Sequence, residues 1–354
     1  KINLQHFNYE VGLKMIKPSF DKVLGQKRRK PESEFSQFYK DIAASAQIIV
    51  EDALLKIVKH AIEITGISNV CLSGGVALNC KANSKLFHFL KPENIWVQPA
   101  AGDSGGAMGA AFVGWYHHFK KERKIISDTP KQQVYLGTSY SQNELKQILE
   151  EHKVSYKNLE KEDLYSEIAK QLSDKKIVGW FHGRMEFGPR ALGNRSILAN
   201  PLFDDMKGYV NQKIKLREGF RPFAPVVKED KMQDWFEIDK PSKYMLFTHQ
   251  SDKKNVIPSC VHEDLSARVQ TVTEGDNKEL YNLLDEFEKL TKTPVLINTS
   301  FNVRGEPIVE SPEDALYCFF NTGIDILVIE GLIIEKEQNL TNIESFKSKR
   351  YELD

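Results

Sequence analysis

Apolar residues recur at helical spacing over one long stretch of the first third of the chain. Between Asp41 and Ile64 they return every three or four positions, which predicts a single amphipathic helix that ends at Gly66. Short apolar runs at 69–72 and 95–98 predict two strands, and a glycine-rich turn and a helical segment follow each run. The repeated order of strand, glycine turn and helix favours a layered α/β domain.

The remainder of the chain alternates between helical and strand-like patterns. The predicted elements are helices at Gln142–Glu151, Glu162–Ser173 and 277–290 and strands at 176–181 and 294–298, with further strand material at 324–334. Asp276 is the expected N-cap of the third helix. The polar segment 120–133, which contains Pro130, predicts a linker, and the last twenty residues predict a frayed polar tail.

The composition is that of an ordinary globular protein and adds two exclusions. With 354 residues, of which 41% are hydrophobic, the chain is long enough for about two domains. Its 49 basic side chains balance 49 acidic ones, which gives no support for a broad nucleic-acid-binding or membrane-binding surface. No apolar run approaches the roughly 18 residues of a membrane-spanning helix.

The cysteines and the first residue bear on context. The four cysteines are scattered without zinc-site spacing, which is typical of a reducing compartment, so we expect a cytoplasmic protein. Because the chain begins at Lys1, we expect a fragment of a longer protein.

Two glycine turns carry candidate ligand-binding residues. The first, LSGGVALN at 72–79, follows a predicted strand and presents backbone N–H groups at a helix start, where a phosphate or ribose could approach. The second, QPAAGDSGGA at 98–107, adds a carboxylate that suits a hard cation. The nucleotide-binding candidates are Gly74, Gly75, Asn79 and Gly102, and the metal-ligand candidate is Asp103. An ordinary tight turn and a helix-capping aspartate are the alternatives.

Cations gather in two further segments among glycines, prolines and aromatic residues. They are Arg184, Arg190 and Arg195 within 183–196, and Lys215, Arg217 and Arg221 within 213–225. Planar guanidinium groups match phosphate or carboxylate oxygens two at a time, so the first segment favours an anion pocket over a solvated charge cluster. In the second segment Glu218 could orient one arginine, and a salt-bridged surface is an equal alternative.

Polar residues near the end of the chain form the last candidate group. The strand predicted over 294–298 ends at Asn298, and Ser300, Asn302 and Arg304 come directly after it. His262, with Asp264 and Arg268 nearby, could position an anion or shuttle a proton. Asx and ST turns, and a histidine in a turn, account for the same residues equally well.

Five motifs occur in one order along the chain: LSGGVALN, QPAAGDSGGA, GRMEFGPRALGNRSIL, FRPFAPVV and PVLINTSFNVRGEPIV. Together they resemble the carbamoyltransferase family that includes the nodulation and antibiotic O-carbamoyltransferases, and the resemblance runs from about Leu4 to Ile334. It implies an α/β and α+β fold. The implied parts are the second lobe of an actin-like (ASKHA) domain over 1–125, a linker over 126–138, a YrdC-like domain over 139–335 and a polar tail over 336–354. The HxxxH metal pair of the first actin-like lobe does not occur in this chain.

The resemblance also implies a reaction. The YrdC-like domain would activate carbamoyl phosphate with ATP to carbamoyl adenylate and release pyrophosphate, and the carbamoyl group would move to an acceptor hydroxyl in the actin-like domain. The implied catalytic residues are Arg190, Arg217, Arg221, Arg268, Asn298 and Ser300, and the implied substrate-binding residues are Arg184, Arg195, Lys215, Asn302, Arg304 and His262. Mg²⁺ would accompany ATP. Iron or another divalent metal would occupy the actin-like site, which Asp103 alone leaves incomplete.

The acceptor, such as a sugar or an antibiotic, is not specified by these motifs. Two other interpretations stay open: a non-catalytic nucleotide- or anion-binding module, and a tRNA-modification enzyme of the threonylcarbamoylation type. The neutral net charge gives no support to the second. We expect no membrane partner and no nucleic-acid partner, and a homodimer stays open.

Overall fold

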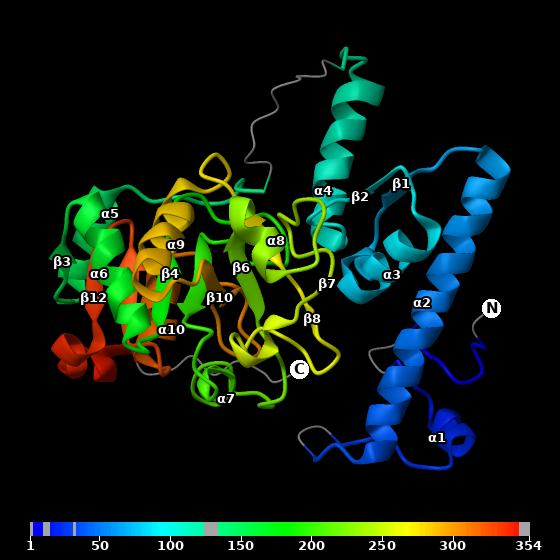
Figure 1. The fold of residues 1–354 in the computed structure, drawn as a ribbon, viewed down its shortest axis with the longest axis horizontal. Coiled ribbons are helices and arrows are strands. Elements are labelled where there is room, and N and C mark those ends of the chain that lie inside the picture. Colours follow the sequence, from blue (N-terminus) through cyan, green and yellow to red (C-terminus); the bar gives the residue numbers. More distant parts are fainter. Residues whose placement is uncertain (1–2, 10–14, 31–32, 124–133, 347–354) are drawn as a thin grey trace. The chain divides into compact units, whose positions relative to one another are not determined.

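The computed structural model describes residues 3–9, 15–30, 33–123 and 134–346, within two compact units, 1–60 and 61–354 (Figure 1). The first unit carries the helix α1 (Pro18–Leu24) and most of α2 (Gln37–Thr65). The helix predicted over 41–64 is confirmed and begins four residues earlier. Gly66 ends it by donating its N–H to the Ile62 carbonyl oxygen at 2.9 Å, with a left-handed φ of +67° that glycine tolerates.

Two predicted strands of the second unit pair in parallel. β1 (Asn69–Leu72) and β2 (Asn94–Val97) are joined through α3 (Cys80–Leu90). α4 (Asp103–Phe112) follows β2 and continues into a π-helical turn at 113–118. The two glycine turns therefore lie at the same end of this small sheet, where the Gly74 N–H donates to the Ala101 carbonyl oxygen at 2.8 Å.

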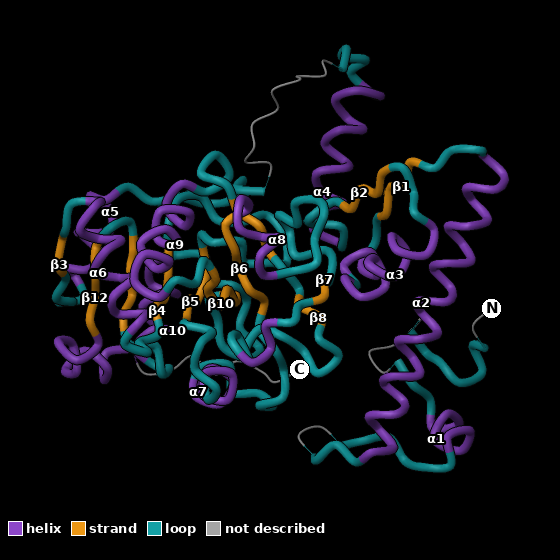
Figure 2. The backbone as a smooth tube through the Cα atoms, in the orientation of Figure 1, coloured by secondary structure: helices purple, strands orange, loops and turns teal. Residues whose placement is uncertain are grey.

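An eight-stranded mixed sheet forms the centre of the region 134–346 (Figures 1 and 2). Its strand order is β3-β12-β11-β4-β5-β10-β6-β9. In that order the strands span Lys157–Asn158, Leu332–Glu335, Ile326–Ile329, Val178–Phe181, Arg195–Ala199, Val295–Ser300, Ala224–Lys228 and Gln270–Val272. A separate two-stranded ribbon pairs β7 (His249–Gln250) with β8 (Ser266–Ala267).

Helices cover both faces of the large sheet because both faces are apolar. Trp180 packs into one core cluster with two helices that lie side by side in Figure 1, α6 (Lys161–Ser173) and α9 (Lys278–Thr291). The next residue, Phe181, points to the opposite face and packs into the other cluster. That second layer comprises α5 (Gln142–Glu151), α7 (Met206–Lys213), α8 (Met232–Trp235) and α10 (Pro312–Phe320). The layered α/β class is confirmed.

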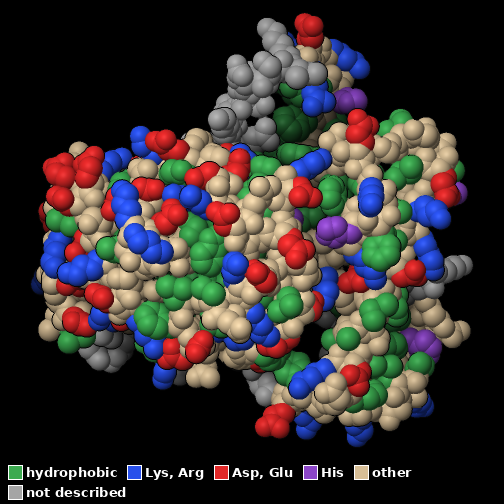
Figure 3. Space-filling view, viewed as in Figure 1, with side chains coloured by type: hydrophobic (Ala, Val, Ile, Leu, Met, Phe, Trp, Pro, Cys, Tyr) green, Lys and Arg blue, Asp and Glu red, His purple; other side chains and the backbone are tan. Residues whose placement is uncertain are grey.

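Charged side chains of both signs are interspersed over the face drawn in Figure 3. This distribution accords with equal numbers of basic and acidic residues in the chain. No helix within the described ranges is both long enough and apolar enough to cross a membrane.

The predicted N-cap of the helix over 277–290 is wrong. The N-cap of α9 is Asn277, whose Oδ1 accepts the Leu280 N–H at 3.1 Å, whereas the Asp276 carboxylate accepts from the Thr273 hydroxyl. The strand material predicted over 324–334 is confirmed as a hairpin of β11 and β12. Its turn residues Glu330 and Gly331 both have positive φ, the geometry that lets two antiparallel strands connect tightly.

The prediction of a frayed tail is wrong for residues 336–346. Residues 336–346 form short helical turns after β12, and the Asn339 side chain accepts the Ser155 N–H at 2.7 Å. Phe346 is fully buried and stacks on Phe320 with ring centroids 4.8 Å apart. Residues 347–354 lie outside the described residues, as do residues 124–133, where most of the predicted linker falls.

Replacing Phe346 with alanine should therefore destabilise this domain. Loss of a fully buried aromatic side chain predicts a decrease of about 3–5 kcal/mol in the free energy of unfolding, measured by urea titration. Leu340→Ala in the same segment is the matched control, because Leu340 is 61% exposed and should change the midpoint little. Equal effects of the two substitutions would contradict the packing of this segment.

Candidate anion-binding site

A pocket of about 360 Å³ collects most of the residues that the sequence predicts to bind anions. Its lining comes from three loops of the large sheet and from four isolated positions. The residues are Pro189, Arg190, Ala191, Arg217, Arg221, Pro222, Phe223, Ala224, Asn298, Thr299 and Ser300, with Cys80, Met245, His262 and Arg268. Seven of these, Arg190, Arg217, Arg221, Arg268, Asn298, Ser300 and His262, are predicted site residues.

Strand directions explain why distant segments meet here. β10 pairs antiparallel with β5 on one side and with β6 on the other. The end of β10 therefore lies beside the beginnings of both neighbours, and the loops that precede β5 and β6 meet Ser300 at one edge of the sheet. Asn298 stands opposite Leu198 on one side and Ala224 on the other. The polar end of a buried strand thus becomes the floor of the pocket.

The loop that carries Arg190 is folded around a buried carboxylate. Oε1 of Glu186 accepts the backbone N–H groups of Leu192 at 2.7 Å and Asn194 at 2.8 Å. Backbone N–H groups that converge on one carboxylate hold a loop without regular secondary structure in a single shape. Arg190 is therefore presented to the pocket by a fixed loop.

The pocket holds more positive than negative charge. Burial lowers the pKa of Arg190 to about 10, with the nearby Arg268 guanidinium as a further cause, and burial lowers the pKa of Arg217 to about 10. Burial also lowers the pKa of Arg268. None of the lining residues carries a carboxylate, and outside the lining Glu218 forms an ion pair with Arg221 at 2.9 Å.

Three polar atoms of the lining are buried without a hydrogen-bond partner. They are Nε of Arg190, Nε of Arg268 and Oδ1 of Asn298. The Asn298 amide nitrogen is engaged, since it donates to Oε1 of Gln270 at 2.7 Å. A buried polar group without a partner costs about 1–3 kcal/mol, and more when it is charged. The pocket is therefore arranged for a ligand that offers acceptors to the two arginines and a donor to Asn298.

Lys215 lies behind the pocket and holds the end of β10 in place. Its Nζ donates to Ser300 Oγ at 3.2 Å, to Asn302 Oδ1 at 2.8 Å and to the carbonyl oxygens of both residues. Burial lowers the pKa of Lys215 to about 7. The Asn302 side chain in turn donates to the Glu306 carbonyl oxygen at 2.7 Å. Lys215 and Asn302 therefore position Ser300 instead of lining the pocket.

Comparison with known proteins identifies the family of this chain. The family model described as carbamoyltransferase C-terminus matches residues 169–336, and the model described as carbamoyltransferase N-terminus matches residues 1–112. The chain belongs to the carbamoyltransferase family. The pocket lining falls within the C-terminal match except for Cys80, which lies within the N-terminal match.

Relatives of this carbamoyltransferase-family chain include two nodulation proteins. An uncharacterized protein of Synechocystis sp. is 42% identical and covers 100% of the chain. Nodulation protein NolNO of Sinorhizobium fredii is 35% identical over 94% of the chain, and nodulation protein NolO of Bradyrhizobium diazoefficiens is 34% identical over 93%. The chain spans 62%, 49% and 60% of the lengths of these relatives, respectively.

Among solved structures, full-length HypF in its phosphate- and nucleotide-bound form matches 50% of this chain and 22% of its own. The TM-score is 0.36 and the sequence identity is 19%.

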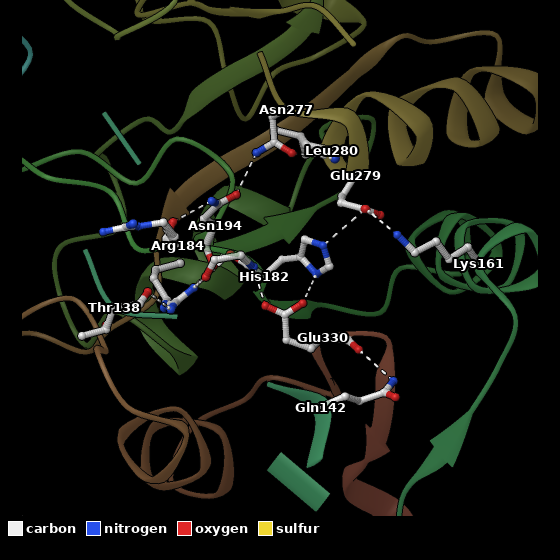
Figure 4. Close-up of polar contacts among 12 residues, drawn as sticks. Thr138, Gln142, Lys161, His182, Arg184, Asn194, Asn277, Glu279, Leu280 and Glu330 are labelled. Carbon is white, nitrogen blue, oxygen red and sulfur yellow. Dashed lines mark hydrogen bonds and ion pairs between the residues drawn. The ribbon is translucent and has the colours of Figure 1, made fainter. Parts of the chain in front are cut away.

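Two predicted substrate-binding arginines lie outside the pocket, and one of them, Arg184, is labelled in Figure 4. Arg184 donates to the carbonyl oxygens of Leu136 at 2.6 Å and Gly137 at 3.1 Å. Arg195 is fully buried, lies over the Phe181 ring at 3.5 Å, and donates to four carbonyl oxygens, including that of Thr138. In this structure both guanidinium groups fasten the arginine-rich segment to the domain, and their substrate-binding role stays a prediction. Arg304 is also absent from the pocket lining.

The predicted nucleotide and metal residues lie around the small sheet of β1 and β2. Gly74 and Gly75 have open space where a Cβ would stand, and Asn79 caps α3 by accepting the Ala82 N–H at 3.1 Å. Gly102 is the N-cap of α4, so Asp103 is the first helical residue rather than the cap, and it is exposed. Over the ranges that the structure describes, no three His, Cys, Asp or Glu side chains are grouped to hold a metal ion.

Sequence reasoning missed a polar cluster around His182, drawn in Figure 4. Its Nδ1 lies 3.3 Å from Glu330 and its Nε2 lies 3.5 Å from Glu279, which also pairs with Lys161 at 2.9 Å. Burial lowers the pKa of His182 to about 4, with Lys161 and Arg195 as further causes. No spacing pattern links these residues, since they come from four separate parts of the chain.

The substitution Arg268→Met should abolish phosphate binding without lowering the free energy of unfolding. Removal of a buried, incompletely partnered charge predicts an unchanged or higher free energy of unfolding, by about 1 kcal/mol, with loss of phosphate binding. Thermal unfolding with and without inorganic phosphate measures both quantities, because a ligand that binds the native state raises Tm. Arg184→Ala is the control and should keep the phosphate-induced shift. A full shift in Arg268→Met would contradict the assignment of the pocket.

Because His182 is buried in its neutral form, the free energy of unfolding should decrease as the pH falls. The native pKa is below the ordinary value of 6.5, so between pH 6.5 and about 4 the unfolded chain binds a proton that the native chain does not. Stability is therefore lost as pH falls through this window. His182→Gln should reduce the slope of unfolding free energy against pH, while His249, whose pKa burial also lowers to about 4, maintains part of it. An unchanged slope would refute the burial of a neutral His182.

Proposed function

We propose that this chain activates carbamoyl phosphate with ATP and passes the carbamoyl group to an acceptor hydroxyl. One carbamoyl phosphate, one ATP and one water would give carbamoyl adenylate, pyrophosphate and phosphate. In this scheme carbamoyl phosphate loses its phosphate to water, and an oxygen of the resulting carbamate attacks the α-phosphorus of ATP and displaces pyrophosphate. The family assignment supports carbamoyl transfer, and the ATP-dependent step is our proposal.

The observation that carries the proposal is the set of incompletely partnered guanidinium groups in one pocket. Arg190 and Arg268 each keep a buried Nε without a partner, and no carboxylate lines the cavity. A dianionic phosphate would supply the missing acceptors, and Oδ1 of Asn298 would accept from the carbamoyl amide. Positive charges that are already in place lower the barrier of a step that develops negative charge on oxygen.

A second hollow offers room for the nucleotide. This cavity of about 410 Å³ shares Pro222 and His262 with the anion pocket, and Phe220 at its wall is 64% exposed. An exposed aromatic ring next to a cationic pocket suits a base that stacks while its phosphates reach the arginines. Lys207, also in the wall, would add a further contact to a polyphosphate.

We also propose a metal ion and an acceptor for this chain. Mg²⁺ would enter with ATP. Gly74, Gly75, Asn79 and Gly102 are proposed to contact a nucleotide or acceptor at the small sheet. The residues described around Asp103 do not assemble a metal site by themselves, so no step is assigned to iron there. The acceptor is proposed as a hydroxyl of a sugar or an antibiotic.

The test is pyrophosphate release from ATP with and without carbamoyl phosphate, in the absence of an acceptor. We expect release that depends on carbamoyl phosphate, and Arg221→Ala should abolish it. Arg221 lines the pocket and is 47% exposed, so its removal should leave the fold intact. Arg184→Ala should retain release. Unchanged release in Arg221→Ala would refute the assigned pocket, and binding of both substrates without any release would favour a non-catalytic binding module.

A further inference from the structure

The side chain of Cys80, a thiol, lines the anion pocket. Cys80 is the first residue of α3, is partly exposed, and lines the pocket with Arg190 and Arg268. Both guanidinium groups are near enough to Cys80 to interact with it electrostatically. Arg190 Nη2 also donates to the Leu78 carbonyl oxygen at 3.5 Å, which keeps the thiol segment beside the arginine loop.

The other three cysteines provide an internal comparison. Cys260 and Cys318 are buried, and burial raises the pKa of each thiol, which keeps both in the less reactive protonated form. Cys71 is exposed on β1 and does not line the pocket. Cys80 alone among the four combines solvent access with a position in the pocket.

Three buried atoms of the pocket that Cys80 lines lack a hydrogen-bond partner. Nε of Arg190 and Nε of Arg268 are buried without acceptors, and Asn298, which is 1% exposed, has a buried Oδ1 without a donor. An oxygen attached to the Cys80 sulfur would lie in the same pocket as these atoms. A sulfenic acid offers both an oxygen to the guanidinium donors and an O–H to an acceptor.

We infer that Cys80 is a site of reversible oxidation by peroxides, and that its oxidised form closes the anion pocket. The Cys80 sulfur attacks one oxygen of hydrogen peroxide, the O–O bond breaks, and the departing hydroxide takes the thiol proton to form water. The sulfur is oxidised by two electrons to a sulfenic acid, and the peroxide is reduced. Thiols reverse this step. The inference rests on the anion-binding role proposed for the pocket.

The inference is tested by trapping sulfenic acid with dimedone after peroxide treatment, followed by peptide mass spectrometry. We expect Cys80 to be trapped at least about tenfold faster than Cys71, and saturating inorganic phosphate to protect Cys80 but not Cys71. Equal rates at the two cysteines, or no protection by phosphate, would overturn the inference.

A second measurement follows the consequence for binding. Peroxide should abolish the phosphate-induced rise in Tm in the native chain and in Cys71→Ser, and dithiothreitol should restore it. In Cys80→Ser the phosphate-induced rise in Tm should be the same with and without peroxide. A native chain that keeps its shift while Cys80 is fully trapped would overturn the inference.

The two proposals fail in different ways. If the untreated chain shows no phosphate shift, the pocket does not bind anions, and the role of Cys80 is lost with it. If the untreated chain shows the shift and peroxide leaves it unchanged, the Cys80 inference alone is wrong. If phosphate protects Cys80 but pyrophosphate release is absent, the oxidation site stands and the proposed reaction is wrong.

Discussion

The anion pocket holds guanidinium groups away from water, and its lining offers no carboxylate to neutralise their charge. Arg190, Arg217 and Arg268 are all desolvated enough for burial to lower their pKa values, and no carboxylate lines their pocket. Burial of charge without a partner destabilises the native state. An eight-stranded sheet with apolar clusters on both faces offsets this cost, and the arginines lie in loops at the ends of its strands. The stability of the layers makes the charged pocket tolerable.

Close packing places the floor of the pocket accurately. Gly179 of β4 lies beneath Phe301, so that a Cβ at residue 179 would stand 2.9 Å from the Phe301 ring. Phe301 follows the last residue of β10 and is fully buried. The missing side chain in one strand thus lets an aromatic ring anchor the end of another. Lys215 fixes the same strand end from below through Ser300, and a shift of either contact would move the floor relative to the arginines.

Sequence patterns predicted the elements whose apolar periodicity is undisturbed, and they failed where function interrupts it. The helices α2, α5, α6 and α9 and the strands β1, β2 and β10 follow their patterns closely. β5 was missed because it opens with Arg195 inside a run of glycines and arginines, and β6 was missed because it contains Pro225. In the site, residue type alone predicts an arginine's affinity for oxygen. It does not tell whether that oxygen is a ligand, as the pocket suggests for Arg268, or a backbone carbonyl, as for Arg195.

The pocket joins the two matched segments of the family into one site. Cys80 lies in the N-terminal match and the arginines in the C-terminal match. Buried polar contacts tie these segments together, since Asn83 donates to the Leu246 carbonyl oxygen at 3.0 Å and Ser84 to that of Thr248 at 3.0 Å. Buried hydrogen bonds tolerate little sliding, because separation would leave their groups unpaired. These bonds of α3 therefore hold Cys80 of the N-terminal match in the wall of the arginine pocket.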